Sequence, residues 1–447
     1  MSKLPGMNRR TFTGAALATA AMPTVLRSAG AAQDATVVTY GLWDANQLPA
    51  YQACADAFTA ANPTITIQIE QLGWDDYWTS LQTGMVSGST YDIFTDHLAK
   101  YPEFASREQI VDIQPFVDRD GVAVDGYEGE LADLWSREGR RYGLPKDWDT
   151  IAVVYNKAML DAAGIDPAIF DEWTWNAKDG GTFGEIVAQL TLDEAGENGL
   201  SETFNKETVA QYGLAMELGD AYGQSSWSIF AASTGWRFMD EPWGEEYHFD
   251  DPRVQETIQY FADMSLVQGF MVPEEEVVSL MAETVFASGS CALVFMGSWM
   301  INWLGDKVTQ EFGFGRLPTG PEGRICMFNG LADSIWTGSE VQEEAWLWLK
   351  FLGSPEAQEI VGSFGAVFPA IPSGADAALA AFAEKGLDAS PYLDQAQQEN
   401  GTFLFPIADH AGEYTSIVTA AMQSIALGEQ PAADALNEAN EEVNDLF

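Results

Sequence analysis

The chain is predicted to fold as an α/β protein built from two interleaved lobes. From Thr36 to Thr95, strand-like apolar segments alternate with helix-like segments, which is typical of α/β units. The 447 residues exceed the roughly 250–300 at which a single hydrophobic core stops growing. No Pro/Ser-rich linker and no internal repeat divides the chain. We therefore expect two lobes that share the chain.

The first part of the chain predicts three strands and two helices. The strands are expected over Thr36–Trp43, Ile65–Glu70 and Tyr91–Thr95, and the helices over Leu48–Ala61 and Tyr77–Val86. The alternation favours a largely parallel sheet, in which ligands bind beyond the carboxyl ends of the strands. That rule selects four candidate ligand-binding residues: Trp43 and Asp44 after the first strand, and Asp96 and His97 after the third.

The segment Gly143–Ile165 is the most informative stretch of the chain: GLPKDWDTIAVVYNKAMLDAAGI. A proline turn places Trp148 between two carboxylates, Asp147 and Asp149. Ile151–Tyr155 then reads as a buried strand, Asn156 as an N-cap, and Lys157–Ala163 as a helix closed by Gly164. An aromatic and two acids at the entrance to a strand suit a crossing between lobes, so Trp148 and Asp149 join the candidate ligand-binding residues.

The remainder of the chain is richer in helix. Helices are expected over Thr182–Leu192, Trp227–Thr234, Pro252–Gln268, Glu274–Ala287 and Glu340–Leu352, with a further helix from Ser354-Pro355 and a helical last 40 residues. Strands are expected over Ala292–Met296 and Phe312–Leu317, the latter followed by a turn-rich Pro318–Gly323.

The N-terminus has the pattern of an export signal. Arg9 and Arg10 precede a modest apolar stretch, Gly14–Leu26, and the small residues Ala29–Ala32 offer a cleavage site. The paired arginines favour the twin-arginine route. A membrane anchor is the alternative, but Pro23 and a run shorter than about 20 apolar residues argue against it. We expect residues 1–32 to be a signal peptide and the mature protein to be periplasmic.

The net charge of −46 argues against anionic partners but does not indicate which ligand the protein binds. Such a field repels nucleic acid and anionic membranes. The acids are scattered along a chain that is 47% hydrophobic, which favours a solvated acidic surface, as in a saline habitat, over a docking face for one partner.

Cysteine and histidine predict no metal or cofactor site. Cys54, Cys291 and Cys326 show no CxxC spacing, so three buried thiols are favoured over one disulfide and a free thiol. The three histidines form no paired-ligand pattern. The acidic turn Asp193–Gly199 misses the calcium-loop spacing.

Several segments, taken in order, carry a family likeness over nearly all of the mature chain. They are Phe58–Phe94, Gly143–Ile165, Thr174–Phe183 (TWNAKDGGTF), Phe286–Trp299 (FASGSCALVFMGSW), Arg316–Arg324 (RLPTGPEGR) and Ala345–Ala370. In this order they resemble the extracellular solute-binding proteins of ABC sugar importers, of the maltose/oligosaccharide-binding type (family 1). Two departures stand out. No cysteine directly follows the signal, unlike in the lipoprotein members, which implies a soluble periplasmic protein. The loop Asp96–Lys100 lacks the aromatic and acid that some maltodextrin binders place there, which argues against maltodextrin as the ligand.

The resemblance implies a two-lobe periplasmic-binding-protein fold (type II), with mixed sheets, helices on both faces and hinge strands between the lobes. The first lobe is expected at 33–148 and 318–366, and the second at 149–317 and 367–447. It also implies a monomer that captures a neutral sugar, oligosaccharide or polyol by cleft closure and delivers it to permease subunits, without catalysis.

Sugars need flat apolar faces and polar groups that bind hydroxyls, which suits tryptophan with acids and amides. The resemblance adds Trp299, which leaves a buried strand through Gly297-Ser298, and the loop residues Trp227, Trp236, Asn329 and His410. Trp78, Trp303, Trp346 and Trp348 follow helical spacing and are expected to be structural.

Two other functions remain open. The same fold could bind a cation such as a polyamine, attracted by Asp44, Asp96, Asp147 and Asp149. Paired acids beside tryptophans also describe a secreted glycosidase, although no pair has a context that assigns acid and nucleophile roles.

Overall fold

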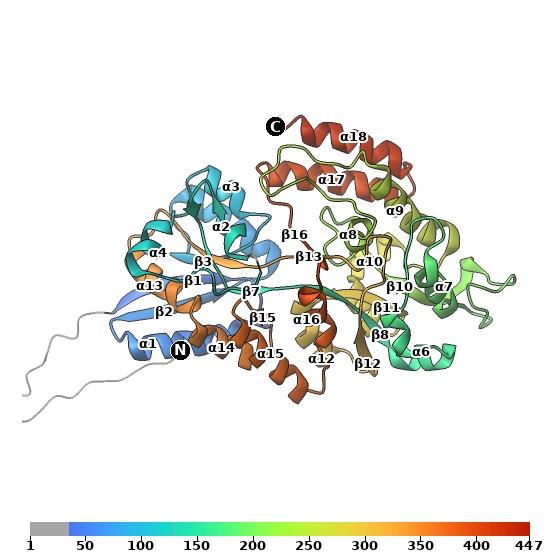
Figure 1. Cartoon of the computed structure of the whole chain (residues 1–447), viewed down its shortest axis with the longest axis horizontal. Coiled ribbons are helices and arrows are strands. Elements are labelled where there is room, and N and C mark those ends of the chain that lie inside the picture. The colour runs from blue at the N-terminus through green and yellow to red at the C-terminus, as the bar shows by residue number, and fades with distance from the viewer. Residues whose placement is uncertain (1–34, 130) are drawn as a thin grey trace, which may run out of the picture.

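The computed structural model describes residues 35–129 and 131–447, and its elements gather around two five-stranded sheets (Figure 1). Both sheets are mixed, which confirms the predicted α/β fold class. The expected signal peptide lies outside the described residues. In the described part of the chain, no helix has the length and apolarity that a membrane crossing requires.

The first sheet has the order β2-β1-β3-β14-β6. Its strands are β1 (Thr36–Leu42), β2 (Ile65–Gln71), β3 (Ile93–Asp96), β6 (Leu144–Pro145) and β14 (Ala332–Ile335). β1 pairs in parallel with β2 and β3, but β14 is antiparallel to both β3 and β6. The three predicted strands are thus parallel, as expected, and the two strands added from later in the chain make the sheet mixed. The chain leaves the first sheet after β6 and returns to it at β14, after passing through the second sheet. These two strands are therefore not linked to β3 by the helix crossover that a parallel neighbour needs.

Helices flank this sheet, with α2 and α3 above it and α1 and α14 below it in Figure 1. α1 buries Tyr51, Cys54, Ala55 and Phe58, the spacing of one helix face. The helices of this half are α1 (Leu48–Ala61), α2 (Trp74–Ser87), α3 (Tyr101–Ser106), α4 (Gln114–Asp120), α5 (Leu131–Leu134), α13 (Gln342–Leu352), α14 (Pro355–Ser363) and α15 (Pro372–Glu384). A short hairpin of β4 (Ser136–Arg137) and β5 (Arg140–Arg141) completes it.

The second sheet has the order β12-β8-β11-β10-β9. Its strands are β8 (Ile151–Asn156), β9 (Leu192–Asp193), β10 (Val209–Ala215), β11 (Cys291–Gly297) and β12 (Phe312–Gly315). Every residue of β8 and β11 is buried, which explains their unbroken apolar runs. A separate pair joins β13 (Cys326–Phe328) to β16 (Thr402–Leu404).

The helices around the second sheet follow the predicted ones with two differences. The expected helix Glu274–Ala287 is two helices, because Met281 takes a φ of +67° between them. The expected helix Pro252–Gln268 ends in a π-turn, Met264–Gln268. The helices are α6 (Lys157–Ala163), α7 (Gly181–Leu190), α8 (Trp227–Ala232), α9 (Pro252–Asp263), α10 (Glu274–Leu280), α11 (Ala282–Ala287), α12 (Ile301–Lys307), α16 (Ser390–Gln397), α17 (Ala411–Ala426) and α18 (Ala432–Asn444). Short 3₁₀ turns lie at Pro167–Asp171, Lys206–Thr208 and Ser298–Met300.

The strand-to-helix joint predicted after the crossing is confirmed in detail. Asn156 caps α6 by accepting the Met159 N–H at 3.2 Å, and Gly164 closes the helix in the left-handed conformation. The three cysteines are buried thiols, as predicted.

The two sheets are joined where separate passes of the chain run side by side. β7 (Asp147–Trp148) pairs with β15 (Phe368–Pro369), and the Asp149 N–H donates to the Asn329 carbonyl at 2.9 Å. These contacts place β7 at the crossing, in the middle of Figure 1, from where the chain continues through β8 to α6 at the lower right.

Two segments lie on the other side from the one expected. Residues near Thr319, expected with the first sheet, exchange backbone hydrogen bonds with Trp173 and Trp175, each 2.9 Å long, beside the second sheet. α15, expected with the second sheet, packs along α14 and against β15.

Candidate binding cleft

A cleft of about 420 Å³ lies between the two halves. This volume falls within the roughly 300–1,000 Å³ of small-molecule sites. Its lining comes from both halves: Trp43, Asp44, Gln47, Trp74, His97, Ala99, Lys100, Asp147, Trp148, Asp149, Asp220, Tyr222, Gln224, Ser298, Trp299, Asn329, Leu331, Val367, Phe405 and Thr415.

The first half supplies an aromatic wall. Trp43 follows β1, and Trp74 begins α2 with 44% of its surface exposed. Their rings meet edge to face at 5.0 Å, and Trp74 meets His97 in the same way at 5.7 Å. Tyr77 and Trp78 pack behind Trp43 at 5.4 Å each. The buried pair therefore holds Trp43 in place and leaves an indole surface for the cleft.

The second half supplies a facing set of aromatic side chains. The indole of Trp299 folds back over Gly297, where a Cβ atom would collide with the ring. Only glycine allows this close approach, so Gly297 fixes the direction of Trp299. Tyr222 packs on Phe405 at 4.7 Å, and Phe405 reaches across to His97 at 5.5 Å.

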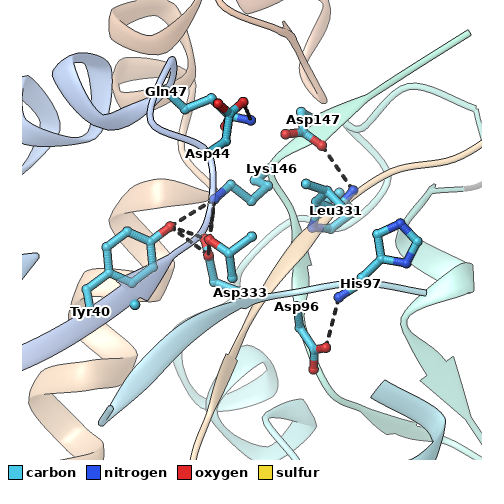
Figure 2. Close-up of polar contacts among 12 residues, drawn as sticks. Tyr40, Asp44, Gln47, Asp96, His97, Lys146, Asp147, Leu331 and Asp333 are labelled. Atoms are coloured by element: carbon cyan, nitrogen blue, oxygen red, sulfur yellow. Dashed lines mark hydrogen bonds and ion pairs between the residues drawn. The ribbon is translucent and has the colours of Figure 1, made fainter. Parts of the chain in front are cut away.

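Two carboxylates form the floor at the crossing. Asp147 accepts the Leu331 N–H at 3.0 Å through one oxygen, as Figure 2 shows, while its other oxygen is buried and finds no partner among the described residues. Burial raises the pKa of Asp147 to about 6. Asp149 accepts the Gln224 amide at 2.6 Å and the Asn329 amide at 3.2 Å. Burial, with the charge of Asp147 second, raises the pKa of Asp149 well above its usual value.

His97 is a neutral hydrogen-bonding group in this cleft. Burial, with the nearby Lys100 as a smaller cause, lowers the pKa of His97 to about 3. Its Nδ1 accepts the Ala99 N–H at 3.0 Å, which leaves the ring proton on Nε2. Nε2 lies 3.4 Å from Asn329 Nδ2, so two N–H groups face each other and both can donate to an oxygen placed in the cleft.

Several buried polar atoms around the floor have no partner within the described residues. They are Asp147 Oδ2, Asn329 Oδ1, Ser298 Oγ and Trp148 Nε1, and all four residues line the cleft. An unpaired buried polar atom costs about 1–3 kcal/mol, so a ligand that pairs these atoms gains that free energy.

A buried ion pair holds the chain between β6 and β7, where it enters the crossing. Lys146 Nζ donates to Tyr40 and Thr95 at 2.8 Å each and lies 3.3 Å from Asp333 (Figure 2). Lys146 and Asp333 are 3% and 2% exposed. The network ties β6 to β1, β3 and β14, directly before the floor residue Asp147.

The structure brings together seven of the eleven residues singled out in the sequence. The cleft is lined by Trp43, Asp44, His97, Trp148, Asp149, Trp299 and Asn329. Asp96 is fully buried behind His97, where it accepts the His97 N–H at 2.8 Å, and burial raises its pKa to about 8.

The other three residues lie away from the cleft. Trp227 and Trp236 are fully buried in the aromatic core of the second half, where they donate to the carbonyls of Asp220 and His248. His410 is exposed and packs its ring on Phe447. Trp346 and Trp348 are fully buried, which confirms the structural role predicted for them.

Sequence reasoning missed several residues that line the cleft. In the sequence, Asp147 is a candidate only for a cationic ligand and Lys100 is only the end of the His97 loop, so neither is selected for a sugar site although both line the cleft. Trp74 precedes the expected helix Tyr77–Val86, whereas in the structure it is the first residue of α2. Tyr222, Gln224 and Phe405 come from loops of the second half that have no motif of their own.

A family model described as bacterial extracellular solute-binding protein matches residues 44–359. The chain belongs to this family. The match spans well over half of this solute-binding protein, including every strand of the two five-stranded sheets except β1, and most of the cleft.

Individual relatives are distant in sequence but similar in fold. A Brucella abortus (strain 2308) protein named as a binding protein is 24% identical over 328 residues, 70% of this chain and 71% of that protein. The ABC substrate-binding protein Lmo0181 from Listeria monocytogenes, solved in complex with cycloalternan, has a TM-score of 0.77 at 18% identity, covering 92% of this chain and 99% of that one. UgpB from Mycobacterium tuberculosis, solved with glycerophosphocholine, has a TM-score of 0.75 at 16% identity, covering 92% and 98%. The two structures establish that this solute-binding protein shares their two-lobe fold.

Proposed function

We propose that this solute-binding protein captures a neutral sugar, oligosaccharide or polyol and delivers it to the permease of an ABC importer. The observation that carries the proposal is the make-up of the cleft. Trp43, Trp74 and Trp299 line the cleft together with buried polar atoms that have no partner in the part of the chain that the structure describes. Sugars present apolar C–H faces and hydroxyl groups, which match this combination. The Listeria relative was solved in complex with cycloalternan, and another similar structure is described as a sugar-binding protein from Xanthomonas citri.

The roles of the ligand-binding residues follow from their positions. Trp43, Trp74 and Trp299 stack on ring faces. Hydrogen bonds from ligand hydroxyl groups are accepted by the side-chain oxygens of Asp44, Asp147, Asp149 and Asn329. His97 Nε2 donates a hydrogen bond to a ligand oxygen. Trp148 offers the edge of its indole at the floor.

Capture works by closure of two lobes over the ligand. We assign the first lobe to about 35–147 and 330–384, and the second to about 149–328 and 386–447. This assignment differs from the expected bounds because of the contacts of Thr319 and α15. A ligand that touches both lobes shifts the population toward the closed form, which the permease reads.

We also propose that the protein is exported. An extracellular solute-binding family is consistent with a periplasmic location. The signal peptide over residues 1–32, the twin-arginine route and a monomeric mature protein complete this proposal.

The decisive experiment identifies the ligand. Mass spectrometry of solute retained by the purified protein, followed by calorimetry against a panel of sugars and polyols, should find a saturable sugar or polyol. A panel without heat, together with saturable binding of another solute class, would overturn the sugar proposal. Small-angle scattering should then show a smaller radius of gyration with the ligand than without it.

A cationic ligand is the second candidate, favoured by the charge of the cleft. Four carboxylates line it, Asp44, Asp147, Asp149 and Asp220, against the single cation Lys100. Buried charges are normally paired, and a ligand ammonium would pair these. A thermal-shift screen in which spermidine, and no sugar, raises the melting temperature would promote this candidate.

The family and the matched relatives are binding proteins, and we infer that this chain does not catalyse a reaction. Turnover of a chromogenic glycoside that Asp149→Asn abolishes would instead support the glycosidase alternative.

A further inference from the structure

The two lobes touch at a second place, away from the crossing strands. Arg137, on β4 beside the first sheet, donates two parallel hydrogen bonds to Asp409 at 2.9 and 2.8 Å. Asp409 lies two residues before the start of α17, a helix of the second lobe. The side chains are 32% and 30% exposed, so the pair is partly shielded from water. Bidentate pairs of this geometry are the strong ones among ion pairs.

A tryptophan from the second lobe completes the contact. The Arg137 guanidinium lies 4.2 Å from the ring centre of Trp243, a cation–π geometry. The same indole meets Tyr101 of α3 edge to face at 5.6 Å and donates to the Ser136 carbonyl at 3.4 Å. Trp243 belongs to the second lobe. Its backbone N–H donates to the Ile407 carbonyl, and farther along the same loop the Tyr247 backbone N–H donates to the Asn444 side chain on α18.

The backbone at this contact is unusual. Among the described residues, six other than glycine have positive φ. Three of these six are Trp243 itself (+65°), Glu138 after Arg137 (+54°) and His410 after Asp409 (+61°). Such conformations cost about 1–3 kcal/mol each and persist only where the surroundings hold them. Glu138 forms, with Gly139 (+79°), the tight turn that joins β4 to β5, whereas Trp243 and His410 hold less common conformations beside the contact.

The contact sits at the rim of the cleft. Tyr101 directly follows Lys100, which lines the cleft, and Asp409 lies four residues beyond Phe405, which also lines it. α3 contacts α17 here, and in Figure 1 they approach each other across the top of the gap between the lobes. The crossing strands lie at the centre of the molecule, so the contact spans the gap at a point where lobe rotation would separate it.

We propose that Arg137, Trp243 and Asp409 form a latch that fastens the lobes when the cleft is closed and so sets how long a bound solute is retained. The proposal rests on the closure mechanism above and adds residues that touch no ligand. These three side chains each contact the opposite lobe, so they favour the closed form over the open one.

The test measures the closed population directly in ligand-free protein. Dyes are attached at Val86→Cys and Leu200→Cys, exposed positions on the two lobes, while the native cysteines are buried. Single-molecule energy transfer then gives the ratio of closed to open molecules. We expect Arg137→Gln to lower that ratio about twofold to fivefold and Trp243→Ala about tenfold, from the usual strengths of ion pairs, cation–π contacts and aromatic pairs.

A charge swap guards against misfolding as an explanation. Arg137→Asp should lower the ratio, and adding Asp409→Arg to it should restore most of the loss, which a general structural defect would not do. The matched control is Arg119→Gln, which removes an ion pair inside the first lobe, where Arg119 Nη1 donates to both carboxylate oxygens of Glu343.

The outcomes separate the latch from the closure mechanism. Two interconverting states whose ratio is the same in Arg137→Gln, Arg137→Asp and the wild type would overturn the latch and leave closure intact. An equal effect of Arg119→Gln would also overturn it. A single state in the wild type, unchanged by the ligand that mass spectrometry identifies, would overturn closure and the latch together.

Discussion

The indole of Trp148 lies flat on the ring of Phe368, with centroids 4.6 Å apart and 12° between the planes. The two residues also face each other in the β7–β15 pair, so one stacked contact joins two distant passes of the chain. Phe368 covers one face of the indole, and the buried Nε1 has no partner among the described residues. We therefore propose that Trp148 presents its edge to the cleft and that Trp43, Trp74 and Trp299 stack on the ligand.

Replacing Trp148 should affect both stability and binding. Loss of a fully buried tryptophan costs about 3–5 kcal/mol of unfolding free energy, so Trp148→Ala should be strongly destabilised. Trp346→Ala is the matched control, since Trp346 is equally buried in the first lobe and donates to Asp120 at 2.9 Å. Calorimetry should show weaker ligand binding for Trp148→Ala only. If either variant does not fold, Trp148→Phe and Trp346→Phe are compared instead. Equally small changes in ligand affinity for the two positions would show that Trp148 is not part of the site.

Trp74 offers the cleanest test of stacking. Its side chain is 44% exposed, so Trp74→Ala should change the unfolding free energy by less than about 1 kcal/mol. Loss of an aromatic face against a sugar should weaken binding about tenfold. Trp303→Ala, half-buried against the second sheet and outside the cleft, should leave affinity unchanged. Titration of the three proteins with the identified ligand decides between these expectations.

Asp147 should make stability depend on pH. Its pKa is raised from 3.8 to about 6 in the folded protein, so folding favours the protonated carboxyl. This group's contribution is therefore most favourable below the unfolded pKa and is lost as pH rises from about 4 to 6, by about 3 kcal/mol. Asp147→Asn should raise the unfolding free energy at pH 7, flatten that part of the pH profile and weaken ligand binding.

Urea unfolding at pH 4, 5, 6 and 7 measures the effect, with the exposed Asp56→Asn as the control. A variant that keeps the wild-type slope between pH 4 and 6 would show that Asp147 does not titrate in this range.

The Lys146–Asp333 pair predicts a large loss that a second change repairs. Lys146→Met leaves a buried carboxylate without its cation, which typically costs about 3–5 kcal/mol. The double variant Lys146→Met/Asp333→Asn removes that charge and should recover much of the loss. Thermal melts of the wild type, both single variants and the double variant form a complete cycle. Simple additivity of the two single effects would show that the paired side chains drawn in Figure 2 are not energetically coupled.

Local patterns in the sequence predicted the parts of the fold that local forces decide. The Asn156 cap, the Gly164 stop and the bounds of α1 follow from side chain–backbone bonds and one-faced apolar spacing. Strand-end positions likewise brought Trp43, Asp44 and His97 to the cleft. The break at Met281 was missed, since no glycine or proline marks it.

Long-range packing decided the rest. Trp227 and Trp236 look like cleft residues in the sequence, yet their indole N–H groups find carbonyl partners inside the second lobe. Tyr222 and Phe405 are far apart in the chain and meet only because α17 and the loop after β10 fold together. No spacing rule connects such residues in a single sequence.

The position of β14 in the first sheet bears on how the protein is made. β14 pairs with β3 and β6, so a sheet begun near residue 36 stays incomplete until residue 335 has been synthesised. During translation the apolar edge of β3 therefore waits about 240 residues for its partner, and contacts of such separation form slowly. A nascent chain that cannot finish its first lobe early remains extended for longer, which lengthens the time in which chaperones and export machinery can engage it.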